Sequence, residues 1–146
     1  MFQSIVIGTD GSDTAREAVG RAVELAAGVG ARVHVVSAYE PLRGVRVAGG
    51  ERTPERSEWR VGPESRVEAV LAEALGACNA RGVDAQGHAR EGDPAEAILE
   101  VADQQGADLV IVGNKGMTGS RRFLLGSVPD KVSHHAPCAV LIVKTA

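Results

Sequence analysis

A glycine-rich segment, Gly113–Val128, has the composition of an anion-binding loop. It follows an apolar run at 109–112 that is typical of a strand buried on both faces. It ends in Ser127, which is predicted to be the N-cap of a helix beginning at Val128. Glycines let backbone N–H groups approach an anion, and a helix start offers unpaired donors and the positive end of its dipole. A surface loop that uses its glycines for turns is the alternative.

The charge of this segment is opposite in sign to that of the chain. Lys115, Arg121, Arg122 and Lys131 stand against one acid, Asp130, whereas the whole chain has a net charge of −3. These cations favour an anion site, although they would equally keep a surface loop soluble.

A second group of turn-forming and polar residues follows the first apolar run. Residues 8–12 read Gly-Thr-Asp-Gly-Ser. Asp10 either shapes this turn or contacts a ligand. Because Ser12 and Asp13 are better placed to cap the next helix, the pattern favours a ligand contact for Asp10, directly or through Mg²⁺.

Strand and helix patterns alternate along the chain. The expected strands are 3–9, 32–39, 83–90, 108–112 and 139–143, and the expected helices are 13–27, 64–80, 94–105 and 128–135. The third strand alternates with polar residues, as edge strands do. This order requires parallel pairing through right-handed crossovers. We therefore expect one α/β domain over residues 1–146, a three-layer doubly wound fold with five parallel strands and helices on both faces.

The two loops richest in glycine and polar groups follow the first and fourth strands. In doubly wound folds, ligands bind beyond the carboxyl ends of the strands, where the winding reverses. If these two strands are neighbours at that point, Asp10 and the loop 113–127 face the same crevice.

Residues 40–63 interrupt the alternation. They contain three prolines, four glycines and nine charged residues and show no period. A connection this long without secondary structure is uncommon in a compact domain, so we expect a flexible loop or lid, with Trp59 as its large apolar anchor.

Spacing excludes several enzyme classes. The chain has no G-x-x-x-x-G-K-[ST], the motif of P-loop NTPases, and no G-x-G-x-x-G after the first strand, the motif of dinucleotide oxidoreductases. It also lacks G-x-S-x-G, the nucleophile elbow. A phospho-acceptor receiver domain would have paired acids after the first strand, where Asp10 stands alone. Cys78 and Cys138 form neither a CxxC nor a zinc-binding spacing.

Composition narrows the class of protein further. Apolar residues make up 44% of the chain and aromatic residues only 3%, so aliphatic side chains must fill the core. Mild acidity and the lack of aromatic platforms argue against a nucleic-acid partner. No apolar run approaches the length of a membrane span, and Gly8 and Asp10 interrupt any signal peptide, so we expect no membrane partner and a cytoplasmic location.

The loop residues match a complete motif. Gly113, Gly116, Gly126 and Ser127 give the register G-x2-G-x9-G-S. This register, with its flanks at 7–12 and 125–143, resembles the ATP-binding members of the universal stress protein family; residues 40–63 lie outside the resemblance. The resemblance implies the strand order 3-2-1-4-5. It also implies binding of ATP or another adenine nucleotide, with Mg²⁺ as a companion ion of ATP.

The resemblance also implies which residues contact the nucleotide. Gly8, Thr9 and Asp10 would line the adenosine end, and Ala38 would meet adenine through its backbone. Backbone N–H groups would do most of the remaining binding. Ribose and phosphates would lie against Gly113, Gly116, Gly119, Gly126, Ser127 and Val128. Asn114 and Met117 occupy positions where variation is expected, and we interpret them as tuning which nucleotide fits.

These features predict an adenine-nucleotide-binding protein of the stress response that acts as a sensor, regulator or nucleotide sink. It is not expected to be an efficient enzyme, because no base, nucleophile or metal cluster is arranged beside the phosphates. A slow ATP-hydrolysing or nucleotidyl-transfer enzyme is the alternative, and a dimeric interaction module with a vestigial pocket is a third interpretation.

The last apolar run predicts self-association. At one edge of a 3-2-1-4-5 sheet, residues 139–143 would leave backbone groups unpaired, and pairing with the same strand of a second copy removes that edge. We therefore expect a homodimer through this strand. His34 and His88 lie far apart in the sequence and are assigned no role.

Overall fold

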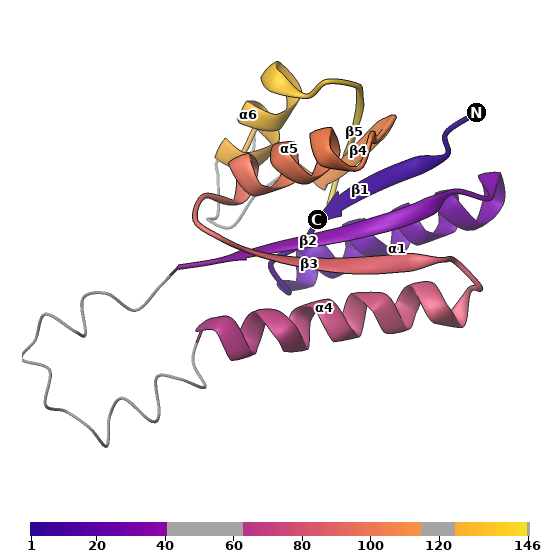
Figure 1. Cartoon of the computed structure of the whole chain (residues 1–146), viewed down its shortest axis with the longest axis horizontal. Helices are drawn as coiled ribbons and strands as arrows, with labels where there is room; N and C mark the ends of the chain where they lie inside the picture. The colour runs from indigo at the N-terminus through magenta and orange to yellow at the C-terminus, as the bar shows by residue number, and fades with distance from the viewer. Residues whose placement is uncertain (41–62, 115–124, 146) are drawn as a thin grey trace, which may run out of the picture.

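The computed structural model describes residues 1–40, 63–114 and 125–145 (Figure 1). Its strands are β1 (Ser4–Gly8), β2 (Arg32–Tyr39), β3 (Ala85–Glu91), β4 (Leu109–Gly113) and β5 (Ala139–Val143). Its helices are α1 (Asp13–Val29), α4 (Pro63–Ala80), α5 (Pro94–Gln104) and α6 (Ser127–His135). The flexible loop predicted at 40–63, with Trp59, lies outside the described residues apart from its two ends.

All five strands form one parallel sheet in the order β3-β2-β1-β4-β5, which confirms the predicted fold class and strand order. In the centre, Ile5 of β1 is in register with Val33 of β2 on one side and with Leu109 of β4 on the other. β3 and β5 are the two edges. β1 and β4 are therefore neighbours, as the prediction of a shared crevice requires.

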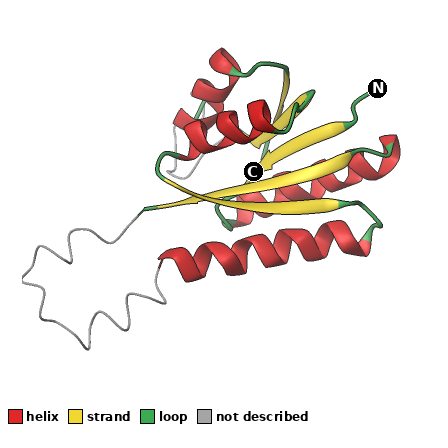
Figure 2. Ribbon diagram, in the orientation of Figure 1, coloured by secondary structure: helices red, strands yellow, loops and turns green. Residues whose placement is uncertain are grey.

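Helices cover both faces of the sheet (Figures 1 and 2). Successive side chains of a strand point to opposite faces. Ile5 and Ile7 pack into one core with α1 and α4, whereas Val6 packs into a second core with α5 and α6. Both cores consist mainly of aliphatic side chains, as the scarcity of aromatic residues requires. None of the described helices is long and apolar enough to cross a membrane.

Capping residues set the ends of α1 and α5. The Ser12 hydroxyl accepts a hydrogen bond from the Ala15 N–H at 3.2 Å, and Gly30 ends α1 with a φ of 73°. α1 ends at Val29, two residues beyond the predicted end at 27, so Gly28 lies inside the helix. α5 begins at Pro94, the predicted first residue, and Asp93 caps it, because its carboxylate accepts from the Glu96 N–H at 3.0 Å.

The start of α6 differs from the prediction by one residue. Gly126 is the N-cap, so the prediction that Ser127 caps this helix is wrong. The Asp130 N–H donates to the Gly126 carbonyl at 3.0 Å, which closes the first turn one residue earlier than expected. Ser127 is therefore the first helical residue, and its hydroxyl does not serve as the cap.

Asp108 fastens the amino end of the sheet. Its carboxylate accepts hydrogen bonds from the Gln3 N–H at 2.9 Å and the Ser4 N–H at 3.1 Å. Burial raises the pKa of Asp108, but the backbone hydrogen bonds from Gln3 and Ser4 bring it below its usual value. These bonds join the segment before β4 to the start of β1.

His34 and His88 meet in the interior, so the sequence interpretation missed a contact. Nδ1 of His34 lies 3.0 Å from Nε2 of His88, and the two residues are only 2% and 7% exposed. The two histidines lie on neighbouring strands, because β2 pairs with β3. Val36, two residues after His34, packs into the core under α5, so His34 lies on that same face of the sheet. One imidazole donates and the other accepts, so the pair holds together with both rings neutral.

Burial lowers the pKa of both histidines below 6.5. Arg32 lowers the pKa of His34 further and Asp84 opposes this, whereas His34 and Arg90 add to the lowering at His88. In the unfolded chain both rings titrate near 6.5, so below that pH the unfolded state binds more protons than the folded state.

We therefore expect the free energy of unfolding to be independent of this pair above pH 6.5 and to fall as the pH decreases toward the folded-state values. The slope should be about 1.4 kcal/mol per pH unit for each proton taken up on unfolding. The variant with both His34→Asn and His88→Gln keeps a donor and an acceptor in place but cannot titrate. Urea unfolding from pH 7.5 to 5 should show a shallower acid slope for this variant. Equal slopes would mean that other groups cause the acid sensitivity.

Candidate functional site

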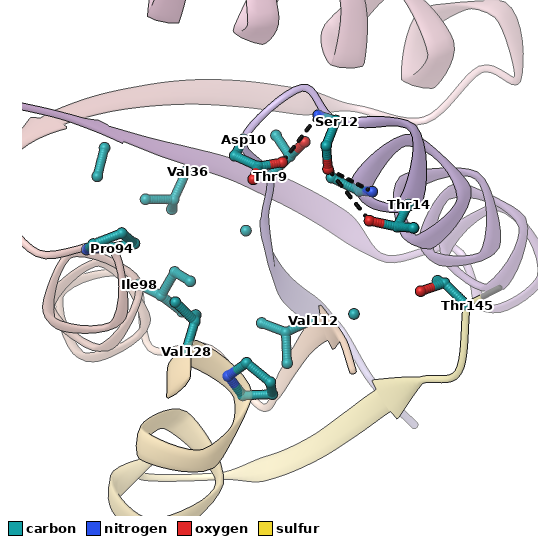
Figure 3. Close-up of a pocket in the computed structure, with 15 residues that line it drawn as sticks. Thr9, Asp10, Ser12, Thr14, Val36, Pro94, Ile98, Val112, Val128 and Thr145 are labelled. Atoms are coloured by element: carbon teal, nitrogen blue, oxygen red, sulfur yellow. Dashed lines mark hydrogen bonds between the residues drawn. The ribbon is translucent and has the colours of Figure 1, made fainter. Parts of the chain in front are cut away.

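A pocket opens at the carboxyl end of the sheet, where β1 and β4 end (Figure 3). β1, β2 and β4 contribute to it, together with Thr145 just beyond β5 and residues near the starts of α1, α5 and α6. Its lining consists of Gly8, Thr9, Asp10, Ser12, Thr14, Ala15, Val36, Ala38, Pro94, Ile98, Val112, Gly113, Val128, Pro129 and Thr145. Asp10 and Gly113, the first residue of the loop 113–127, therefore line one crevice, as predicted, whereas residues 115–124 of that loop lie outside the described residues.

One side of the pocket is apolar. Val36 and Ala38 lie two residues apart on β2, so they face the same way. Pro94 and Ile98 lie four residues apart on α5, and Val128 begins the facing wall on α6. Figure 3 shows Ile98, Val112 and Val128 gathered on this side. Such a surface suits a planar, uncharged ring.

The other side is polar and belongs to the turn between β1 and α1. The Asp10 carboxylate accepts from the Ser12 N–H at 2.9 Å, and the Thr9 hydroxyl accepts from the Gly11 N–H at 3.2 Å. Gly11 has a φ of 81°, which this turn requires and which glycine adopts without strain. Asp10 thus shapes the turn, the role that the sequence did not favour, and it also lines the pocket as expected.

The start of α6 supplies backbone donors beside the pocket. The N–H groups of Ser127 and Val128 lie in the first turn, where a helix has no internal acceptors for them, and Pro129 has no N–H. Gly126 is held in place because its N–H donates to the Asn114 carbonyl at 3.0 Å. An anion at this point would meet two donors and the positive end of the helix dipole.

Lys131 is engaged by carboxylates of α5. Its Nζ lies 3.1 Å from the Glu96 carboxylate and 3.5 Å from the Asp93 carboxylate. Hydrogen bonding to Glu96 raises the pKa of Lys131, with a further contribution from Asp93. Of the four cations in the predicted loop and helix start, Lys131 is the one that the structure describes, and it joins α6 to α5.

Most of the predicted binding residues that the structure describes meet at one place. Gly8, Thr9, Asp10, Ala38, Gly113 and Val128 line the pocket, and Gly126 and Ser127 adjoin it at the start of α6. Gly116 and Gly119 lie outside the described residues, as do Lys115, Met117, Arg121 and Arg122.

Sequence reasoning missed several lining residues, above all Thr145. Thr145 is 5% exposed and lies just beyond β5. The predicted parallel sheet could have indicated Thr145, because the residues that follow each parallel strand lie at the same edge of the sheet. The role of Asn114 in nucleotide choice stays a prediction, and its side chain accepts from the Thr145 N–H at 2.8 Å and from the Thr145 hydroxyl at 3.0 Å. These bonds occupy Asn114 within the protein and give it a structural role at the pocket edge.

Gly8 is needed for close packing beneath the pocket. A Cβ on Gly8 would collide with Cδ1 of Ile98 and lie 3.0 Å from its Cγ1. Ile98 is 3% exposed and packed against the sheet, so it has little room to retreat except into the pocket.

We expect Gly8→Ala to lower the free energy of unfolding by about 1–3 kcal/mol, since it overpacks this contact. Ile98→Val alone should cost about 0.5–1.5 kcal/mol. The double variant should be less destabilised than the sum of the two, because valine lacks the Cδ1 that collides. Urea unfolding of all four proteins measures the coupling, and additive costs would show that Gly8 matters for another reason.

Comparisons with known proteins agree with this geometry. A model of the universal stress protein family matches residues 1–144. A universal stress protein of Thermus aquaticus is 38% identical, over 99% of this chain and 100% of its own length.

Two solved structures share the fold. A universal stress protein in complex with cAMP is 34% identical, with a TM-score of 0.75 and coverage of 99% of this chain and 98% of its own. The universal stress protein from Archaeoglobus fulgidus in complex with dAMP has a TM-score of 0.69 at 24% identity, covering 97% and 98% of the two chains. The sheet order, the pocket at its carboxyl end and the match along almost the whole sequence lead to one conclusion: this chain belongs to the universal stress protein family.

Proposed function

We propose that this protein binds ATP or another adenine nucleotide and acts as a sensor, regulator or nucleotide sink in the stress response. The observation that carries the proposal is the pocket in which the ends of β1, β2 and β4 meet the start of α6. The relative crystallised with cAMP, 34% identical over nearly the whole chain, supports the choice of ligand class.

The adenine ring fits the apolar side of the pocket. Val36, Ile98 and Val128 would enclose its faces, and the backbone of Ala38, at the open end of β2, would meet its polar edge. Pockets for small molecules commonly combine such apolar walls with a few placed polar groups. Asp10, on the polar side, is a suitable acceptor for a ribose hydroxyl.

Phosphate would lie at the start of α6. The N–H groups of Ser127 and Val128 offer donors there, and the hydroxyl of Ser127 is free of the capping role. A Cβ at Gly113 would lie 3.7 Å from Ala18 Cβ, which is ordinary contact, so packing alone does not require glycine at this position. This mode of binding relies on the backbone more than on charged side chains.

We propose binding rather than efficient turnover. Asp10 is the one ionisable side chain among the described lining residues, and its carboxylate already accepts the Ser12 N–H. Within the described ranges, no group of three or more His, Cys, Asp or Glu side chains could hold a metal ion. A Mg²⁺ ion that accompanies ATP would thus take most of its ligands from phosphate and water. Product release at enzyme-like rates would instead favour the alternative, a slow ATP-hydrolysing or nucleotidyl-transfer enzyme.

Replacing Asp10 with asparagine tests the site without disturbing the turn, because an amide oxygen can still accept the Ser12 N–H. We expect Asp10→Asn to weaken AMP binding about tenfold, since a charge-assisted bond to ribose becomes a neutral one. Calorimetric titration with ATP, ADP, AMP and cAMP measures this. Asp13→Asn is the matched control, because it removes the same charge from a 98% exposed side chain outside the pocket lining.

The titrations separate the interpretations. Equal affinity of the wild type and Asp10→Asn would place the nucleotide elsewhere. A wild-type protein that binds none of the four nucleotides would overturn the proposal and favour an interaction module with a vestigial pocket.

We also propose a homodimer through β5. Among the described strands β5 pairs with β4 alone, and Leu141 is 42% exposed. The Val143 carbonyl accepts from the Asn114 N–H, so it points toward the side of β4. Because backbone groups alternate sides along a strand, the N–H and C=O of Val140 and Ile142 point to the open edge.

A proline at position 142 tests this interface. Ile142→Pro removes an outward N–H and leaves the bonds to β4 in place, so we expect it to shift the protein to monomer in sedimentation experiments. Ile142→Ala is the control, because it loses a comparable side chain but keeps the N–H, and it should stay dimeric. Dimers of equal strength in both variants, or a monomeric wild type, would exclude pairing through β5.

A further inference from the structure

Asn114 joins three segments that meet at the pocket. Its N–H donates to the Val143 carbonyl at 3.0 Å, and its own carbonyl accepts from the Gly126 N–H at 3.0 Å. Its side-chain oxygen accepts two hydrogen bonds from Thr145, from the backbone N–H at 2.8 Å and from the hydroxyl at 3.0 Å. One residue thus fixes the end of β4, the N-cap of α6 and the segment after β5 relative to one another.

Thr145 forms part of the pocket wall. It is 5% exposed, and its Cγ2 would lie 4.0 Å from a Cβ on Gly113. Figure 3 shows it between the end of β5 and the first turn of α1. Its hydroxyl gives its proton to Asn114, so toward the pocket it can only accept. A buried hydroxyl and a backbone N–H therefore depend on one amide oxygen.

We propose that Asn114 and Thr145 form a clasp that positions the nucleotide site. The bonds to Thr145 fix Asn114, whose backbone carbonyl in turn holds Gly126 and the donors at the start of α6 beside Gly113. It also ties the wall residue Thr145 to β4. This inference rests on the proposed nucleotide binding, and it assigns Asn114 as a positioning residue that acts through Gly126 and Thr145.

The clasp also connects the pocket to the edge strand β5. β5 ends at Val143, and the bonds to Val143 and Thr145 flank the point where the strand leaves the sheet. A nucleotide that binds better to the closed clasp must stabilise the closed clasp by the same factor. Bound nucleotide therefore lowers the opening of the segment after β5, which amide hydrogen exchange at Thr145 reports.

Four variants separate positioning from stability. Asn114→Ala removes the acceptor of both Thr145 bonds, whereas Thr145→Val removes the hydroxyl and keeps the shape. Thr145→Ser restores the hydroxyl as the conservative change. Asp108→Ala is the stability control, because it removes a carboxylate that accepts two backbone N–H groups at the opposite end of the sheet.

In titrations with AMP, Asn114→Ala should bind about tenfold more weakly than wild type, because it loses both bonds to Thr145. Thr145→Val should bind about threefold more weakly, because it loses only the hydroxyl bond. Thr145→Ser and Asp108→Ala should bind as wild type does. The double variant Asn114→Ala/Thr145→Val should be no weaker than Asn114→Ala alone, because both changes break the same clasp. In the wild type, AMP should slow hydrogen exchange of the Thr145 amide.

The outcomes distinguish this inference from the proposed function. If wild type binds AMP and Asn114→Ala binds it equally well, the clasp is structural only and the inference is wrong. The same holds if AMP leaves exchange at Thr145 unchanged, or if Asp108→Ala weakens binding as much as Asn114→Ala. If wild type does not bind AMP, ATP, ADP or cAMP, the proposed function fails first and the clasp has no nucleotide to position.

Discussion

All five strands of the sheet run in one direction, and this constraint decides where a ligand can bind. Each crossover helix must begin at the edge where the preceding strand ends. The first turns of α1, α5 and α6 therefore converge on the carboxyl edge, while their carboxyl ends lie at the other. Helix starts carry unpaired N–H groups and positive dipole ends, so this edge attracts anions even where charged side chains are few.

Much of this arrangement could be predicted from local patterns. Apolar runs such as 109–112 identify buried strands, and Asp93 with Pro94 identifies the start of α5, because the physical causes lie within a few residues. The strand order came from the family resemblance, which made β1 and β4 neighbours. Prediction was less exact where one hydrogen bond decides where a helix begins. The Asp130 N–H donates to the Gly126 carbonyl, so Gly126 and not Ser127 is the N-cap of α6.

Contacts between distant residues could not be predicted in this way. His34 and His88 are separated by 54 positions, and Asn114 and Thr145 by 31. Neither pair carries a local signal, because a histidine on a strand or an asparagine after one has many ordinary roles. Only the pairing of β2 with β3, and of β4 with β5, brings them together. Both pairs place polar groups in poorly hydrated surroundings, where each group needs its particular partner and an unpaired one is costly.

The charged side chains near the pocket are largely paired within the protein. Lys131, the cation nearest in sequence to the start of α6 among the described residues, is held by Glu96 and Asp93, and Asp10 is committed in part to its own turn. The described part of the site therefore offers an apolar wall, a few acceptors and backbone donors. For the nucleotide proposed above, such a surface would respond to the shape of the nucleoside and the position of its first phosphate more than to the total charge of the ligand. Under the proposed function, discrimination among adenine nucleotides would depend on how accurately the start of α6 is placed, which would make hydrogen bonds at the base of the loop as important as residues that touch the ligand.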